Sequence, residues 1–279
     1  MVIGENKIIT YFSKNVNLLN KENIHLSIEI SPNNISYCLL NIKNLKFVFL
    51  KSVTVKNTNE LINQIGSEHD LKLEYSSSCV SYKNFPTTLI PNELFDKEKK
   101  HLYLDFLCEN TENIKLDISK KNNCTAVYSI EDKLSQTIQQ IQPNIKERNS
   151  TIVIILQLIK QYSHLKEKIA FLFVYTNKID IYIIEKESLI FQNCFKVSNN
   201  TDILYFTLFC FEQLNLDPNS IELYLFGNIE RGDENYSLLY KYIRNLKFGR
   251  NCNTLSFSEE LKKVSSHNFF SLISQVLCE

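Results

Sequence analysis

Glycine is scarce in this chain, with only five among 279 residues. Phosphate-binding loops rely on glycine, because a residue without a Cβ lets backbone N–H groups come close to the phosphates. The five glycines, at positions 4, 66, 227, 232 and 249, have neither P-loop nor dinucleotide-fingerprint spacing. Neither G-x-S-x-G nor H-E-x-x-H occurs. The sequence therefore lacks the motifs of P-loop enzymes, α/β-hydrolases and zinc proteases.

An excess of charge and a long apolar run are also missing. Lys+Arg and Asp+Glu number 31 each, so the composition does not favour a nucleic acid or an anionic membrane as partner. The most apolar run, 151–159, is far shorter than the roughly 18 to 20 residues that a membrane helix needs. The N-terminus has no secretory apolar core. We expect a cytoplasmic protein with no membrane span and no nucleic-acid partner.

The eight cysteines are widely spaced, and the two closest are 16 residues apart. No C-x-x-C pair exists, and no histidine stands at zinc-finger spacing from a cysteine. Several cysteines lie in apolar runs, where a free thiol packs like a small hydrophobe. We expect buried free thiols rather than a metal site or disulfides.

One strand pattern occurs twice. "HLSIEISPNNISYCLL", at 25–40, alternates apolar and polar residues around a Pro-Asn-Asn turn, and "IAFLFVYTNKIDIYII" repeats the pattern 144 positions later. A third strand and later a helix follow each hairpin, which predicts three-strand meanders over 24–55 and 168–197. Any two amphipathic hairpins share period 2, so coincidence stays open. The matching third strands and helices favour duplication.

The repeat predicts mixed α/β structure in two lobes, each with its own core. The expected division is an N-terminal extension at 1–23, a first lobe at 24–147 and a second lobe at 148–279. A helix at 148–167 is expected to bridge the lobes.

Four further expectations concern single segments. "QPNIKERN", at 142–149, has the composition of a linker. Pro91 is placed in the first turn of a helix. The apolar stretch at 200–217 predicts a helix buried on all sides. The last expected helix runs over 258–277.

A duplicated three-strand meander with helices behind it resembles the actin-like ATPase superfamily, which includes actin, sugar kinases and actin-like components of pilus and type II secretion machines. The resemblance implies an α/β, two-lobed actin-like (ribonuclease H-like) fold. In that family the first hairpin turn carries D-x-G-x-[ST] and the second a like motif. The two turns hold the phosphates of ATP with its Mg²⁺, while a strand that ends in a glycine pair packs on the adenine.

The resemblance also implies where a nucleotide cleft would be. The positions that match the family's two turns and adenine-side strand are Glu29, Ser31, Asn33, Thr176, Asn177, Gly227 and Asn228.

The departures from the family's motifs are as informative as the matches. Ser31 and Tyr175 bring a Cβ where the family has glycine, and Pro32 removes an N–H donor. Glu29 could hold a metal-bound water, but its counterpart in the second half is Phe173, which cannot ligate a metal. Hydrolysis in this family needs carboxylates to place Mg²⁺ and the attacking water. We therefore predict no catalytic residue and no metal site, and expect no cofactor.

A closer resemblance covers nearly the whole chain. "LSIEISPNNISYCLLN", "NFPTTLIPNELFDKEKKHLYLDF", "LFGNI" and the ending "FFSLISQVLCE" are similar to the bacterial domain-of-unknown-function family numbered 3822. That family brings no assigned activity. The resemblance implies the actin-like fold and a bacterial cytoplasmic setting.

Two functions remain. The first is a non-catalytic scaffold or protein-binding module with a degraded nucleotide site, whose partner is another protein or a second copy of itself. The alternative is an ATP-binding protein with weak or no hydrolysis, in which ATP and Mg²⁺ occupy a non-standard cleft. Any enzymatic activity would then be ATPase-like. The missing carboxylate and glycines favour the first, because electrostatic stabilisation normally supplies most of catalysis.

Overall fold

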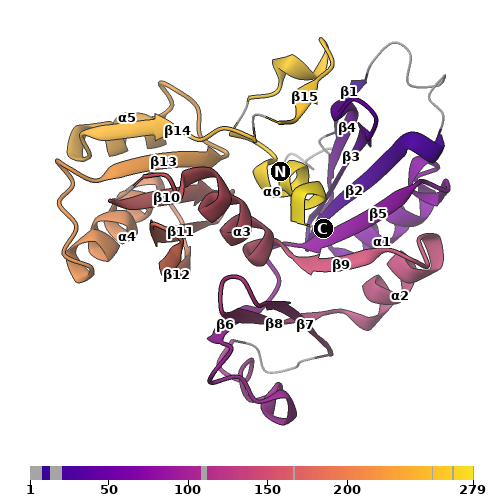
Figure 1. Cartoon of the computed structure of the whole chain (residues 1–279), viewed down its shortest axis with the longest axis horizontal. Coiled ribbons are helices and arrows are strands. Elements are labelled where there is room, and N and C mark those ends of the chain that lie inside the picture. Colours follow the sequence, from indigo (N-terminus) through magenta and orange to yellow (C-terminus); the bar gives the residue numbers. More distant parts are fainter. Residues whose placement is uncertain are drawn as a thin grey trace, which may run out of the picture. The chain divides into compact units, whose positions relative to one another are not determined.

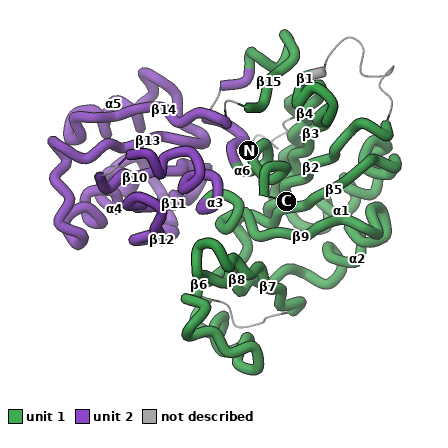
Figure 2. Tube along the Cα trace, in the orientation of Figure 1, with its two compact units in different colours: residues 1–154, 253–263, 271–279 green, residues 155–252, 264–270 purple. Residues whose placement is uncertain are grey.

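A computed structural model describes residues 8–12, 21–107, 112–165, 167–252, 254–265 and 267–278. The chain divides into two compact units, shown in different colours in Figure 2. Unit 1 comprises Met1–Ile154, Asn253–Lys263 and Ser271–Glu279, and unit 2 comprises Ile155–Cys252 and Val264–Phe270. Helix α3 (Ser150–Tyr162) begins in unit 1 and ends in unit 2.

Unit 1 is built on a seven-stranded sheet in the order β1-β4-β3-β2-β5-β9, with β15 also pairing β4 (Figure 1). Its strands are β1 (Ile8–Phe12), β2 (Ile24–Ser31), β3 (Asn34–Asn41), β4 (Lys46–Thr54), β5 (Ser77–Tyr82), β9 (Lys146–Asn149) and β15 (Ser256–Phe257). A separate three-stranded sheet has the order β6-β8-β7, from β6 (Thr87–Pro91), β7 (Asn113–Ser119) and β8 (Cys124–Ile130).

The two faces of strand β2 differ in chemistry. Ile24, Leu26, Ile28 and Ile30 pack into the apolar core of unit 1, which also takes in buried side chains of α1 (Thr58–Ser67) and α2 (Asp132–Ile141). Because side chains alternate along a strand, His25, Ser27, Glu29 and Ser31 project from the other face. All eight residues of β2 are nevertheless buried. Polar groups on that second face therefore need partners inside the protein.

Unit 2 contains a five-stranded sheet in the order β12-β11-β10-β13-β14. Its strands are β10 (Lys168–Val174), β11 (Lys178–Glu185), β12 (Ser188–Lys196), β13 (Glu222–Gly227) and β14 (Asn245–Phe248). Helices α4 (Asn200–Gln213) and α5 (Glu234–Tyr242) pack on its core. A capping box starts α4, because the Asn199 side chain accepts the N–H of Asp202 and the Asp202 carboxylate accepts the N–H of Asn199.

The two meanders have the same internal register. Adding 144 to both members of the pair Ile30–Ile35 gives Val174–Ile179, which are also partners. The β3–β4 ladder has a register irregularity between Leu39 and Leu40. Adding 144 gives Ile183 and Ile184, between which the β11–β12 ladder of unit 2 has a register irregularity too. Such bulges are positional features of a sheet rather than general properties of strands. Duplication stays a prediction, and a duplicated meander would have this shared register.

The C-terminal residues differ from the expected division. The sequence predicts a second lobe that extends to residue 279, whereas the structure groups 253–263 and 271–279 with unit 1. The reason is tertiary: β15 pairs β4, and Gln275 bonds to the backbone of β2. Within the expected extension at 1–23, residues 8–12 form β1, Lys21–Asn23 form a short 3-10 turn, and the others lie outside the described residues.

Three expectations about single segments are wrong. The linker-like 142–149 contains β9, whose polar residues find ion-pair partners, such as Asp117 for Arg148. Pro91 ends β6 instead of starting a helix. In place of one helix over 258–277 there are η5 (Leu261–Lys263), α6 (Phe270–Ser274) and η6 (Gln275–Cys278).

The prediction for α4 is right about the helix but wrong about its all-round burial. Ile203, Leu204 and Phe211 are buried. Tyr205 and Phe209 are 59% and 41% exposed. The helix therefore presents aromatic side chains to solvent.

Glu68, just after α1, is expected to make unit 1 sensitive to acid. Burial alone would raise its pKa, but hydrogen bonds from Lys51 and Tyr37, the Lys51 charge and a bond from Gln64 together hold the pKa below its ordinary value. A depressed folded-state pKa stabilises the fold above the ordinary value of about 4.3 and loses that contribution as pH falls through the folded-state pKa. Melting temperatures measured from pH 6 to 3 should fall more steeply for the native protein than for Glu68→Gln.

The control for this experiment is Glu74→Gln, which removes a carboxylate from an exposed position. Parallel curves for the native protein and Glu68→Gln would contradict the prediction.

Candidate functional site

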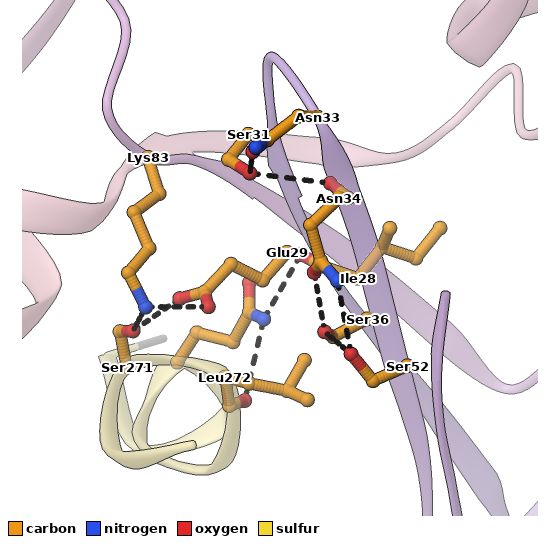
Figure 3. A network of polar contacts seen from close by, with 11 residues as sticks. Ile28, Glu29, Ser31, Asn33, Asn34, Ser36, Ser52, Lys83, Ser271 and Leu272 are labelled. Carbon is orange, nitrogen blue, oxygen red and sulfur yellow. Dashed lines mark hydrogen bonds and ion pairs between the residues drawn. The ribbon is translucent and has the colours of Figure 1, made fainter. Parts of the chain in front are cut away.

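Glu29 lies on the polar face of β2 and is fully engaged within unit 1. One carboxylate oxygen accepts from the Lys83 ammonium at 2.9 Å, and the other accepts from the Ser271 hydroxyl. The side chains of Glu29 and Lys83 are only 7% and 18% exposed. Figure 3 shows Lys83 and Ser271 both pointing at the Glu29 carboxylate. The acidic group that the sequence offers for a metal-bound water is thus already paired.

The C-terminal segment of unit 1 covers this same face. The Gln275 side chain donates to the carbonyl of Ile28 at 3.0 Å. The Arg148 guanidinium donates to the carbonyl of Cys278 at 2.8 Å. Sequence reasoning missed Lys83, Ser271 and Gln275, because they stand 54 to 247 residues from their β2 partners and belong to no motif.

Ser31 and Asn33 lie with Glu29 at the β2–β3 end of the sheet. The Ser31 hydroxyl donates to the Asn33 side-chain oxygen at 3.4 Å. Next to them, Ser36 donates to Ser52 at 2.8 Å, and the Asn34 amide donates to Ser52 at 3.1 Å (Figure 3). Three predicted site residues are therefore neighbours, in a region whose polar side chains bond mainly to one another.

The other four predicted residues belong to unit 2. Thr176 and Asn177 lie in the turn after β10, Gly227 is the last residue of β13, and Asn228 follows it. Because β10 and β13 are parallel, with Val174 opposite Gly227, both pairs come to the same edge of the sheet. Whether all seven residues hold one nucleotide stays a prediction.

The need for glycine at position 227 has a structural explanation that involves no ligand. Its φ is +80°, which a residue with a Cβ rarely adopts. A Cβ there would stand 2.3 Å from the carbonyl oxygen of Val174. The same carbonyl accepts the N–H of Asn228 at 2.8 Å. The close approach of β13 to β10 therefore requires this glycine.

Phe173, the counterpart of Glu29 in the sequence comparison, is part of an aromatic cluster. Its ring stacks on Phe226 with centroids 4.6 Å apart and planes 6° apart, and also contacts Phe270 and Tyr182. Gly249 makes room for this cluster, because a Cβ there would meet the ring of Phe226 at 1.9 Å. Hydrophobic packing thus surrounds the position that the 144-residue offset aligns with Glu29.

The described residues contain no group of three or more His, Cys, Asp and Glu side chains that could hold a metal ion. The seven cysteines in these residues form no disulfide, and Cys38, Cys79, Cys124 and Cys210 are buried. Cys194 is exposed, so the expectation of burial is wrong for it, and Cys108 lies outside the described residues. Among the helices of the described parts, none has the length and apolar character needed to cross a membrane.

The two sheets share one strand order, with a meander followed by two parallel strands, and this arrangement defines the protein as one with an actin-like ATPase fold. Residues 13–246 match the family model described as "Protein of unknown function (DUF3822)", and the chain belongs to this family. The fold class and the family that the sequence suggests are confirmed.

Solved structures with similar folds come from several settings. A Bacteroides thetaiotaomicron protein with an actin-like ATPase fold and unknown function matches 93% of this chain and 97% of its own, with a TM-score of 0.75 and 21% identity. The PilM-PilN type IV pilus biogenesis complex matches over 91% and 98%, with a TM-score of 0.56 and 10% identity. The cytoplasmic domain of EpsL, an inner membrane component of the Vibrio cholerae type II secretion system, matches over 91% and 94%, with a TM-score of 0.42 and 9% identity. The curated proteins contain no match.

Proposed function

We propose that this protein is a non-catalytic, cytoplasmic scaffold that keeps the actin-like fold and acts by binding another protein chain. The observation that carries the proposal is the Glu29 carboxylate, whose two oxygens are bound by Lys83 and Ser271. Phosphoryl transfer depends on positioned Mg²⁺ and on charge stabilisation. A buried carboxylate that already has an ammonium and a hydroxyl partner is poorly suited to hold a hydrated metal ion.

The residues of unit 2 do not fit the metal-nucleotide either. Phe173, which the 144-residue offset aligns with Glu29, stacks on Phe226, and both apolar rings are buried. Gly227 is explained by the backbone of Val174. Mg²⁺ takes oxygen ligands, and the rings of Phe173 and Phe226 offer none. Neither Glu29, which is already paired, nor the apolar position of Phe173 therefore supports catalysis of ATP hydrolysis.

A role in protein binding has independent support from comparison. The similar fold in the PilM-PilN structure belongs to a complex named for two proteins. The exposed aromatic residues of α4 in this chain are also of the kind that protein interfaces use. A scaffold requires such surfaces and no chemistry.

The test is thermal melting and calorimetry with millimolar ATP and Mg²⁺. A ligand at 100 times its dissociation constant would stabilise the fold by about 2.7 kcal/mol, which is visible as a higher melting temperature. We expect no Mg²⁺-dependent shift and no hydrolysis. The proposal is overturned by stoichiometric hydrolysis that Glu29→Gln abolishes and Glu68→Gln, the removal of another buried carboxylate of unit 1, leaves intact.

A further inference from the structure

Strand β12 has an open outer edge. In the portions of the chain that the structure describes, it pairs only with β11 and ends the sheet of unit 2 (Figure 1). The third strand of the other meander, β4, pairs on its outer side with β1 and β15. Natural edge strands are usually short, charged, broken by proline or twisted by a bulge. β12 has nine residues, no proline or glycine, and Lys196 as its one charge, and its register irregularity lies between Leu189 and Phe191, before most of the strand.

The hydrogen-bond pattern shows which residues offer their backbone at this edge. The N–H of Val197 donates to the carbonyl of Asn177, so residue 197 faces β11. Residues alternate in an antiparallel ladder, and Lys196, Cys194 and Gln192 therefore face outward. The hydrogen bond of the Cys194 N–H is consistent with this orientation, because this N–H donates to the side-chain oxygen of Asn193 rather than to β11.

We propose that β12 pairs antiparallel with β12 of a second copy of this chain, with Asn193 on the two-fold axis. The sequence "FQNCF", from Phe191 to Phe195, has phenylalanine at both ends and Asn193 at its centre, so its aromatic residues are symmetric about Asn193. Around Asn193 it places each phenylalanine opposite the other phenylalanine of the second copy, and Gln192 opposite Cys194. A symmetric interface must be self-complementary in this way, whereas a strand from a different protein would need no such symmetry.

Charge is compatible with this register. Lys196 lies across from the Leu189–Ile190 end of β12 in the second copy, which carries no charge, so no like charges face each other across the new pair. Aromatic cross-strand pairs stabilise an antiparallel ladder. The edge therefore attracts its own copy without an electrostatic penalty.

The exposed aromatic side chains of α4 extend the same surface. Phe195 of β12 stacks on Phe206 of α4, with centroids 4.6 Å apart. Tyr205 packs against Phe206 and stacks on Phe209. The apolar surface thus runs from the strand edge onto the helix, and pairing at β12 would place the α4 helices of two copies on the same face of a continuous sheet. Burial of these rings adds hydrophobic free energy to the backbone bonds.

The inference rests on the proposed scaffold function in one respect, since it names the second copy as a partner of that scaffold. Sedimentation equilibrium of the full chain should give twice 32.7 kDa at micromolar concentration. Asn193→Lys places two ammonium groups opposite each other on the axis and should give a monomer. At a protein concentration low enough for the native chain to be monomeric as well, the two melting curves should be the same. Asn59→Lys makes the same charge change at an exposed position of α1 and should stay dimeric.

A second variant tests the register. Gln192→Cys puts a thiol opposite Cys194 of the second copy, at a cross-strand distance that a disulfide spans. Mild oxidation should give a covalent dimer that the added change Cys194→Ser prevents. A native chain that is monomeric, or a dimer that survives Asn193→Lys, overturns the inference. Neither result changes the expected outcome of the ATP experiment, which tests the scaffold proposal separately.

Discussion

Replacing Lys83 by methionine is expected to lower the free energy of unfolding by about 3 kcal/mol, because it leaves a buried carboxylate without its cation. Glu29 is 6% exposed, and its partners in the described residues are Lys83 and Ser271. Methionine keeps the length and apolar stem of lysine, so the loss reports on charge rather than on packing. Urea denaturation at neutral pH measures it.

The matched control is the double variant Glu29→Gln with Lys83→Met, which removes both charges. It should recover part of the loss, because an amide costs less to bury than an unpaired carboxylate. If Lys83→Met proves as stable as the native protein, the carboxylate is solvated and free to bind a cation. That result would remove the main support for a non-catalytic scaffold.

Truncation of Phe226 to alanine should cost about 4 kcal/mol, within the range of 3–5 kcal/mol typical of large buried aromatic residues. Its side chain is fully buried, and its ring packs between Phe173 and Phe270 at centroid distances of 4.6 and 4.7 Å. The cavity cannot close easily, because these neighbours are held by the sheet and by other rings. Chemical denaturation of the full chain, followed by a probe of unit 2, measures the effect.

Tyr242→Ala removes an aromatic side chain that is 55% exposed at the end of α5, and should change stability by less than about 0.5 kcal/mol. A loss below about 1 kcal/mol for Phe226→Ala would argue that the cluster is loosely packed. The sheet around Phe173 would then be open enough to admit a ligand.

Local pattern was sufficient for much of the fold. Alternation of apolar and polar residues located both hairpins to within a residue or two, since a strand with one face in an apolar core must have period 2. The 144-residue offset found in the sequence also holds for the strand register. The family and fold class followed from these patterns together with the resemblance that they support.

Segments without such a pattern were misjudged. β9 is polar, and its place beside β5 depends on partners such as Asp117 for Arg148. The 258–277 segment has helical composition, but Ser258 bonds to β4, Phe270 packs in the aromatic cluster of unit 2, and Gln275 bonds to β2. For α4, apolar composition indicated burial, whereas the number of faces that other elements cover is decided only in three dimensions.

The sequence by itself determined what unit 1 and unit 2 are made of, because hydrophobic periodicity and turn residues act over a few neighbouring positions. It also determined that the residue 144 positions after Glu29 is a phenylalanine, Phe173. Only the tertiary structure decided what happens to Glu29. Its partners Lys83 and Ser271 come from positions 54 and 242 residues away, and no local pattern encodes a contact made by folding.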